Sequence, residues 1–262
     1  MERLLFVDHM HDRRPPRGAD VQTALAHFAI ITFSVDPEIA RRLVHPRFEL
    51  DLVEYGGRSH ALLSVVPFID FDFHFTALPR FKWTFGQTNY RIYVRDSETG
   101  EQVVWFLGTT LDSNSVVIPR YLWKLPWHRG RIQFDCEYNE SRRAYSKYRM
   151  STSKSWANAT VELEDSGQQP TQLSGFDCLE TGLVLLTHPR IGYYYRRDRR
   201  LGSYSIWHDR LVPNQARMQS GNFDLLDRLQ LTISSDVRNV HSVLLQKKAD
   251  FTVYLPPGVV SG

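Results

Sequence analysis

Cysteine is scarce in this sequence, and long apolar runs are missing from it. The 262 residues include two cysteines, Cys136 and Cys178, too few for a disulfide framework or for a zinc site made mainly of thiolates. No run of about 18 apolar residues occurs, so we expect no membrane span and no membrane partner. The apolar core of residues 1–9 is too short for a secretory signal, so we expect a soluble, cytoplasmic protein.

An excess of charge of one sign is also missing, as are the common local motifs of catalysis. Lys and Arg number 32 and Asp and Glu 29, a formal net charge of +3, which does not indicate a nucleic-acid partner. The sequence has no Gly-rich phosphate loop, no H-E-x-x-H metal helix and no G-x-S-x-G nucleophile elbow. We therefore expect no cofactor and no metal.

One short segment leaves a metal alternative open. Asp70, Asp72 and His74 alternate with aromatic residues and could share one face of a strand, where three such ligands could hold a metal ion. An amphipathic edge strand with a solvated side explains the same alternation, and we favour this interpretation.

Alternating and apolar segments predict a β-rich fold. The composition, with 42% hydrophobic and 23% charged residues, is that of a globular protein. Asp36-Pro37-Glu38 predicts a short helix through Leu43, because Asp caps a helix start and Pro fits the first helical position. Further short helices are expected at 116–127, 176–188 and 223–229. Strands are expected at 28–33, in a hairpin over 48–73, and at 89–95, 102–107, 131–138, 144–150, 157–163, 191–196, 204–208 and 250–255.

These elements predict a single α+β domain, mostly antiparallel β, over residues 25–258. Roughly ten strands with only short helices between them favour this class. Residues 12–18 are rich in Pro and Arg, which is typical of a segment outside the core. We expect residues 1–24 to form a flexible basic arm.

A polar face follows the strand at 89–95. Side chains alternate across a strand, so Gln87, Asn89, Arg91, Tyr93 and Arg95 should share one face. The expected partner strand at 102–107 is apolar on both faces, as in a strand covered on both sides. The polar row would then point into covered space, where an unpaired cation is very costly. A cavity that receives an anionic or carbonyl ligand would meet this need; a structural carboxylate partner or a solvated face would also meet it.

A second group of cations has helical spacing. Arg120, Lys124 and His128 are four residues apart, so they would lie on one face of the helix expected at 116–127 if it continues past Pro126. Clustered positive charge lowers the pKa of a lysine and prepares it for Schiff-base chemistry with a carbonyl compound. A solvated basic helix face explains the same pattern.

Aromatic and cationic residues are mixed in the hairpin from Tyr193 to Arg200, as they are in proteins that bind single-stranded nucleic acid. A solvated charged turn is the alternative interpretation. This hairpin supports a third hypothesis, a nucleic-acid or protein interaction module.

The order of motifs along the chain resembles the YqjF-like family of uncharacterised proteins, which is grouped in the acetoacetate decarboxylase-like superfamily. The resemblance covers residues 25–258 and implies an antiparallel sheet that curls into a cone-like barrel around a ligand cavity. The motifs are SVVPF at 64–68, TNYRIYV at 88–94, VWFL at 104–107, RYLWKLPW at 120–127, YSKYR at 145–149, GYYYRR at 192–197, WH at 207–208 and PP at 256–257.

Two departures set the sequence apart from acetoacetate decarboxylase itself. The decarboxylase lysine follows a Gly-aromatic-Pro motif, whereas no lysine follows Pro126 here. Gln87 occupies a position where the YqjF-like pattern often has an acid, so a candidate general acid or base is missing. The resemblance then leaves a set of possible cavity-lining groups, namely Asn89, Arg91, Arg120, Tyr145, Arg149 and His208.

Our leading hypothesis is that the barrel binds a small carboxylate or carbonyl metabolite. Arg91 would hold the anion and Gln87 and Asn89 would donate hydrogen bonds, because a planar guanidinium suits a carboxylate. The alternative is a lyase or hydratase-type enzyme in which Lys124 forms a Schiff base with a keto acid. Whether the protein is an enzyme, and whether it forms a homo-oligomer, stays open. The full set of predicted ligand-binding residues is Gln87, Asn89, Arg91, Arg120, His128, Tyr145, Arg149 and His208.

Overall fold

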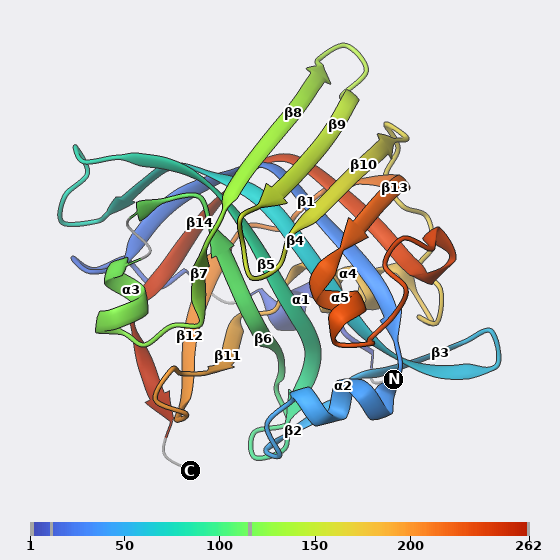
Figure 1. Cartoon of the computed structure of the whole chain (residues 1–262), viewed down its shortest axis with the longest axis horizontal. Coiled ribbons are helices and arrows are strands. Elements are labelled where there is room, and N and C mark those ends of the chain that lie inside the picture. Colours follow the sequence, from blue (N-terminus) through green and yellow to red (C-terminus); the bar gives the residue numbers. More distant parts are fainter. Residues whose placement is uncertain (1–2, 11–12, 115–116, 261–262) are drawn as a thin grey trace.

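The computed structural model describes residues 3–10, 13–114 and 117–260, and one large curled sheet dominates it (Figure 1). The strands are β1 Val21–Val35, β2 Phe48–Leu50, β3 Leu52–Tyr55, β4 Arg58–Phe75, β5 Trp83–Asp96, β6 Gln102–Leu111, β7 Trp127–Arg129, β8 Arg131–Asn139, β9 Ala144–Ser153, β10 Ala159–Asp165, β11 Ile191–Tyr195, β12 Leu201–His208, β13 Asn214–Phe223 and β14 Val240–Val260. The helices are α1 Phe6–His9, α2 Pro37–Leu43, α3 Val117–Leu122, α4 Leu179–Thr187 and α5 Asp224–Arg228, with a 3-10 turn at Val237–Asn239. The predicted α+β, mainly antiparallel class with a few short helices is confirmed.

Part of the sheet closes on itself. The strands β1, β4, β5, β6, β11, β12 and β14 follow one another by hydrogen bonding, and β14 also pairs with β1, which completes a ring. Every pairing in this ring is antiparallel except that of β6 with β11. A closed ring leaves no exposed strand edge. It forms a barrel with its own interior.

The sheet continues beyond the ring through β13, β10, β9 and β8, and this outer part packs against the outside of the barrel (Figure 1). Two hydrophobic cores result, one between the barrel wall and the outer strands and one inside the barrel. On β6, Val103 and Trp105 belong to the outer core, whereas Val104 and Phe106 belong to the inner one. The prediction that the strand at 102–107 is covered on both faces is therefore confirmed.

The short helices are close to their expected positions. Asp36 caps α2, since its carboxylate accepts hydrogen bonds from the backbone N–H groups of Glu38 (2.7 Å) and Ile39 (3.4 Å). Helix α4 packs with the inner core through Leu183, Val184, Leu185 and Leu186. In the described part of the chain, no helix is long and apolar enough to cross a membrane.

Both ends of the described part of residues 1–24 are packed against the body, which differs from the expected flexible arm, whereas residues 13–19 are mostly exposed. Leu4 and Phe6 are buried, and their backbone N–H groups donate to Thr181 Oγ1 (3.2 Å) and Glu180 Oε1 (3.0 Å) of α4. The basic Pro-rich segment predicted an exposed arm, but the apolar residues before it supply a contact with the core. Residues 1–2 and 11–12 of the expected arm lie outside the described residues. The first strand begins at Val21.

Candidate ligand-binding cavity

The barrel encloses a cavity of about 190 Å³. Alternate residues of the ring strands line it, as the two-residue period of a strand requires. On β5 these are Trp83, Phe85, Gln87, Asn89 and Arg91. Gln87, Asn89 and Arg91 of the polar row predicted from the sequence therefore face the cavity, whereas Tyr93 and Arg95 of that row are not among its lining residues.

The wall of the cavity is mainly apolar and aromatic. Its few polar side chains lie on β1, β4, β5, β12 and the end of α4. The aromatic lining residues are Phe28, Phe68, Phe73, Phe75, Trp83, Phe85, Phe106, Trp123, Trp127, Tyr204 and Phe251, and the other polar ones are Thr23, Asp70, Gln87, Asn89, Arg91, Thr187 and His208. Such a wall, with a few convergent polar groups, is typical of a small-molecule site.

Arg91 is held at the end of the cavity nearest α4. Its Nη2 donates a hydrogen bond to the backbone carbonyl of Leu186 (2.8 Å) and lies 3.4 Å from the hydroxyl of Tyr93, which donates to the same carbonyl (3.2 Å). The side chain is 7% exposed, and its Nε has no hydrogen-bond partner among the described residues. No carboxylate of the described chain forms an ion pair with this guanidinium.

Asn89 and Gln87 form a short polar row beside Arg91. The Asn89 Oδ1 accepts hydrogen bonds from Gln87 Nε2 (3.0 Å) and from Thr109 Oγ1 of β6 (2.8 Å). Because these two bonds occupy the amide oxygen, the Nδ2 group of Asn89 is the donor that stays available, with no partner in the described structure. The row can therefore donate a hydrogen bond to a ligand oxygen next to the guanidinium.

Asp70 is a buried carboxyl in the same cavity. It lies on β4 opposite Phe85 of β5, and Thr23 Oγ1 donates a hydrogen bond to its Oδ1 (3.0 Å). Burial raises the pKa of Asp70 to about 7, and the bond from Thr23 only partly opposes this effect. At neutral pH this group is therefore divided between the neutral and the ionised form.

His208 lies at the β12 side of the cavity and is neutral at physiological pH. Burial lowers its pKa to about 4, and the positive charge of Arg91 adds to this effect. Its Nδ1 donates to the carbonyl of Asp209 (2.8 Å), and its ring stacks on Phe251 at a centroid distance of 4.3 Å. The ring is therefore fixed in place without contributing charge.

Lys124 is not among the cavity-lining residues. Helix α3 ends at Leu122, and in the irregular segment that follows, Trp123, Leu125 and Trp127 line the cavity whereas Lys124 does not. Its backbone has a φ of 58°. The prediction of one helix over 116–127 is wrong at its C-terminal end, and its start at Val116 lies outside the described residues.

Arg120 and His128, which are four residues before and after Lys124, are also not among the lining residues of the cavity. Arg120 Nη1 donates to the backbone carbonyl of Trp127 (2.8 Å). The ring of His128 on β7 stacks on Trp156 at 4.5 Å, and burial lowers its pKa to about 4, with further contributions from Arg120 and Arg197. The three residues do not form one basic helix face, because the helix does not extend beyond Leu122.

Tyr145 and Arg149 belong to the outer sheet rather than to the barrel wall. Tyr145 is hydrogen-bonded to His27 Nδ1 (3.0 Å) in the core between the two parts of the sheet. Arg149 is 55% exposed and pairs with Glu162 at 2.8 Å. Both lie on β9, which pairs with β8 and β10 in the outer sheet and with no strand of the ring in the described structure. The expectation that Tyr145 and Arg149 line the cavity is therefore wrong.

The remaining candidate segments are occupied by local contacts. In the hairpin from Tyr193 to Arg200, Tyr193 and Tyr194 are buried, and Asp198 accepts hydrogen bonds from both Arg196 and Arg200. Asp198 therefore compensates cations that a nucleic acid would need.

The metal alternative at Asp70, Asp72 and His74 depends on a regular strand, and the strand is irregular there. Asp72 has a φ of 56° and pairs with the exposed Lys82 at 2.9 Å, whereas Asp70 faces the cavity. A bulge between Asp70 and Phe73 breaks the alternation. No group of three or more metal-ligating side chains occurs in the described part of the chain.

Sequence reasoning did not assign Asp70 and Tyr204 to the cavity. Tyr204 lies on β12 in the lining, burial raises the pKa of its hydroxyl, and that hydroxyl has no hydrogen bond within the described residues. The alternation of Asp70, Asp72 and His74 with aromatic residues was the signal available for Asp70, and we interpreted it as the solvated side of an edge strand. No local signal marked Tyr204, because pairing of distant strands brings it to the cavity.

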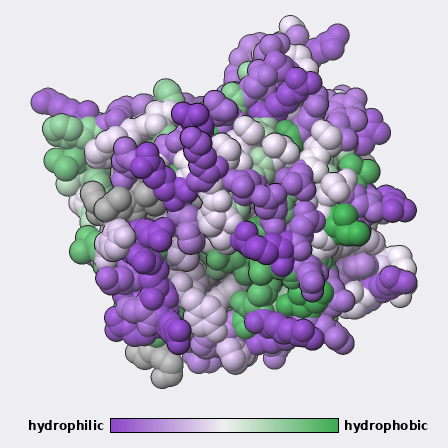
Figure 2. Space-filling view, viewed as in Figure 1, coloured by the Kyte–Doolittle hydropathy of each residue, from purple (hydrophilic) through white to green (hydrophobic). Residues whose placement is uncertain are grey.

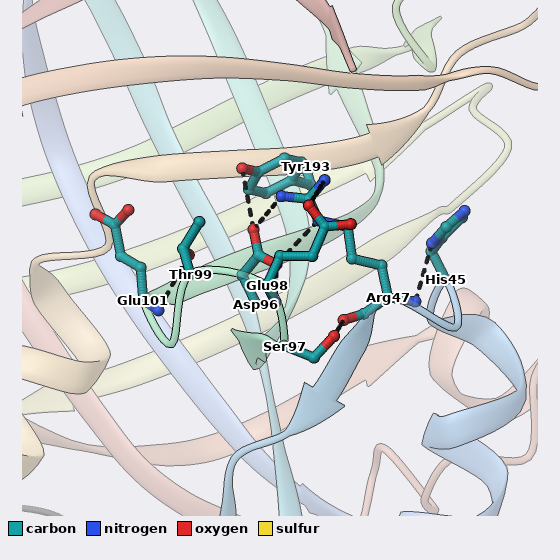
Figure 3. A network of polar contacts seen from close by, with 8 residues as sticks. All are labelled: His45, Arg47, Asp96, Ser97, Glu98, Thr99, Glu101 and Tyr193. Atoms are coloured by element: carbon teal, nitrogen blue, oxygen red, sulfur yellow. Dashed lines mark hydrogen bonds and ion pairs between the residues drawn. The ribbon is translucent and has the colours of Figure 1, made fainter. Parts of the chain in front are cut away.

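A second polar network lies outside the cavity, where β2 meets the turn between β5 and β6 (Figure 3). Arg47 binds Asp96 through two hydrogen bonds, from Nε to Oδ1 (2.9 Å) and from Nη2 to Oδ2 (2.6 Å). The hydroxyl of Tyr193 lies 3.5 Å from the same carboxylate. The Arg47 cation is compensated, so this network joins the strands and offers no unpaired charge to a ligand.

Comparison with known proteins identifies the fold and the family. A model of the family DUF2071, described as an uncharacterized conserved protein, matches residues 22–249. No curated protein matches the sequence.

Solved structures with a similar fold include an acetoacetate decarboxylase from Legionella pneumophila, with 13% identity and a TM-score of 0.57 over 98% of this chain and 96% of that one. The enduracididine biosynthesis enzyme MppR complexed with pyruvate has 12% identity and a TM-score of 0.56 over 95% and 92% of the two chains. An acetoacetate decarboxylase-like enzyme from Sphingomonas wittichii RW1 has 10% identity and a TM-score of 0.56 over 93% and 95%. The predicted acetoacetate decarboxylase-like fold is confirmed.

Proposed function

The chain belongs to DUF2071, a family of uncharacterised conserved proteins, and we propose that it binds a small carboxylate or carbonyl metabolite inside its barrel. The observation that carries this proposal is the environment of Arg91. A buried guanidinium with no ion-pair partner in the described chain borders an open cavity.

The cost of an uncompensated buried charge supports an anionic ligand. Removing one ion from water costs several kcal/mol unless an opposite charge and hydrogen bonds compensate it. Within the described residues, Arg91 contacts a carbonyl dipole, a phenol oxygen and the face of the Tyr93 ring (5.5 Å from Cζ to the centroid), and its Nε is unbonded. A carboxylate that binds the guanidinium would add the missing charge, and the Nδ2 group of Asn89 is a second donor beside it.

The similar fold of MppR, a structure of which was solved in complex with pyruvate, is consistent with a carboxylate or carbonyl ligand in a barrel of this kind. The proposal is restricted to non-covalent binding. A Schiff base needs an amine next to the bound carbonyl group, and no lysine is among the lining residues of the cavity. The interaction-module alternative has less support, because Asp198 compensates two of the cations in its hairpin.

Replacing Arg91 with Met tests the proposal. We expect this variant to bind pyruvate and acetoacetate roughly 10- to 100-fold more weakly than the wild type, since a hydrogen bond to a charged group contributes about 1.5–3 kcal/mol. Isothermal titration calorimetry would measure both affinities. Met has about the same length as the aliphatic part of Arg, so the packing is largely kept.

The matched control is Arg149→Met, which removes an exposed arginine of the outer sheet. This variant should bind both ligands as the wild type does. Equal affinities of the Arg91→Met variant and the wild type, in proteins with the same circular dichroism spectrum, would contradict the role of Arg91.

A further inference from the structure

We infer that the ligand is an amphiphilic monocarboxylate, with its carboxylate at Arg91 and an apolar body that fills the aromatic part of the barrel. This inference rests on the proposed function and adds the chemical class of the ligand. It follows from the distribution of charge in the cavity, from its size and from the order of side chains along β5.

The cavity has a polar end and an apolar end. Along β5 the lining residues change from Arg91, Asn89 and Gln87 to Phe85 and Trp83. Trp83 and Arg91 are separated by eight steps along the strand, which correspond to about 26 Å, so the two ends are well separated. A ligand that uses both ends must itself have a charged head and an apolar body.

The charges of the lining favour one carboxylate and not two. Among the lining residues that the structure describes, Arg91 is the one permanent cation, and His208 is neutral. The lining also contains one ionisable carboxyl group among the described residues, that of Asp70, which lies opposite Phe85 toward the apolar end. A second carboxylate on the ligand would approach Asp70 and find no cation there. The cavity therefore disfavours dicarboxylates.

The size of the cavity exceeds the needs of a three- or four-carbon keto acid. A water-sized atom needs roughly 10–15 Å³ of cavity volume, so a cavity of about 190 Å³ holds on the order of a dozen such atoms. With three atoms assigned to the carboxyl group, about nine carbons remain for the body. A shorter ligand would leave aromatic wall in contact with trapped water, which is unfavourable.

The apolar end reaches the surface at Trp83, which lines the cavity and is 41% exposed. Beside it, the hairpin between β4 and β5 exposes Leu78 and Phe81, the latter 62% exposed. Figure 2 shows hydrophobic side chains at the upper left, where this hairpin projects in Figure 1. An amphiphile can therefore enter head first along apolar surface and place its carboxylate at the inner end.

A chain-length series tests this inference on the wild-type protein. The probes are butanoate, hexanoate, octanoate and decanoate, with binding measured by titration calorimetry and by quenching of tryptophan fluorescence. We expect the affinity to rise about fourfold per methylene, the factor that corresponds to about 0.8 kcal/mol for a buried CH₂. Methyl decanoate and decanedioate should each bind at least tenfold more weakly than decanoate.

A pair of matched variants locates the body of the ligand. Val253 of β14 lines the cavity and pairs with Val21 and Ile206, which line it as well, so Val253→Phe narrows the apolar half. This variant should lose decanoate affinity by more than tenfold and keep butanoate affinity. The control is Val259→Phe at an exposed position of the same strand, which should leave the whole series unchanged.

The outcomes separate this inference from the proposed function. If pyruvate binds and depends on Arg91 while affinity does not rise from butanoate to decanoate, the inference is wrong and the proposed function stands. If no carboxylate loses affinity in the Arg91→Met variant, both are wrong. If methyl decanoate binds as tightly as decanoate, the placement of the carboxylate at Arg91 is overturned. The wild-type series decides the matter even if Val253→Phe does not fold.

Discussion

Replacing Asp70 with Asn should stabilise this protein at alkaline pH and leave its stability unchanged at acidic pH. Asp70 is 4% exposed, and burial raises its pKa from the ordinary value of 3.8 to about 7. Asn has nearly the same shape, and its carbonyl oxygen can still accept the hydrogen bond from Thr23 Oγ1. The substitution therefore removes the ionisation and keeps the local contact.

The sign and size of the effect follow from proton binding in the two states. Between about pH 4 and pH 7 the unfolded chain has lost the Asp70 proton and the folded chain still holds it, so the free energy of unfolding falls as the pH rises. The difference between 3.8 and about 7 corresponds to at most about 4 kcal/mol, reached above pH 7. The Asn variant has no such loss, so its advantage should grow from zero near pH 4 to a few kcal/mol at pH 8.

Urea unfolding from pH 4 to pH 8 measures this difference. Asp51 is also buried, and burial raises its pKa to about 6, so its contribution to the slope is present in both proteins and cancels on subtraction. The control is Asp72→Asn, because Asp72 is a partly exposed neighbour that pairs with Lys82. A stability difference between Asp70→Asn and the wild type that does not change with pH would refute the reasoning, as would a variant that is less stable at pH 8.

Two further substitutions test contacts that are expected to stabilise the strands around the cavity. Arg47→Ala leaves the buried carboxylate of Asp96 without its bidentate partner, and we expect a loss of about 3–5 kcal/mol in urea unfolding; a loss below about 1 kcal/mol would show that the pair is not important for stability. Gly192→Ala places a Cβ 2.2 Å from Cε2 of Phe106, a cavity-lining ring, so the ring must move. This should cost about 1–3 kcal/mol, and an unchanged unfolding free energy would mean that the ring moves freely.

The predictable parts of the fold and the site follow from local alternation. In β5, Gln87, Asn89 and Arg91 face the same side because side chains alternate strictly along a regular strand. In β6 the continuous run Val103–Leu107 indicated cover on both faces, and the two cores provide it. Neither conclusion depends on which strand from a distant part of the sequence is the neighbour in the sheet. The sequence pattern was therefore sufficient.

The parts that failed depend on local irregularities or on distant pairing. At Asp72 a positive φ and a bulge reverse the side of the following residues, and no composition rule marks such a position. Tyr204 faces the cavity because β12 pairs with β11 and β14, which lie before it and far after it in the chain. Tyr145 and Arg149 were placed at the cavity by the family resemblance, and the alternating pattern of their strand does not distinguish the barrel from the outer sheet.

Lys124 shows how the period of a segment determines its chemistry. With a helical period, Arg120, Lys124 and His128 would share one face, and a lysine with a lowered pKa could meet a carbonyl group. In the irregular segment that follows Leu122, where Lys124 has a φ of 58°, Trp123, Leu125 and Trp127 line the cavity and Lys124 does not. The same five-residue segment thus contributes aromatic wall in place of an amine. The barrel shares its fold with acetoacetate decarboxylases, but in the described structure this segment lines the cavity with Trp123, Leu125 and Trp127 and not with Lys124.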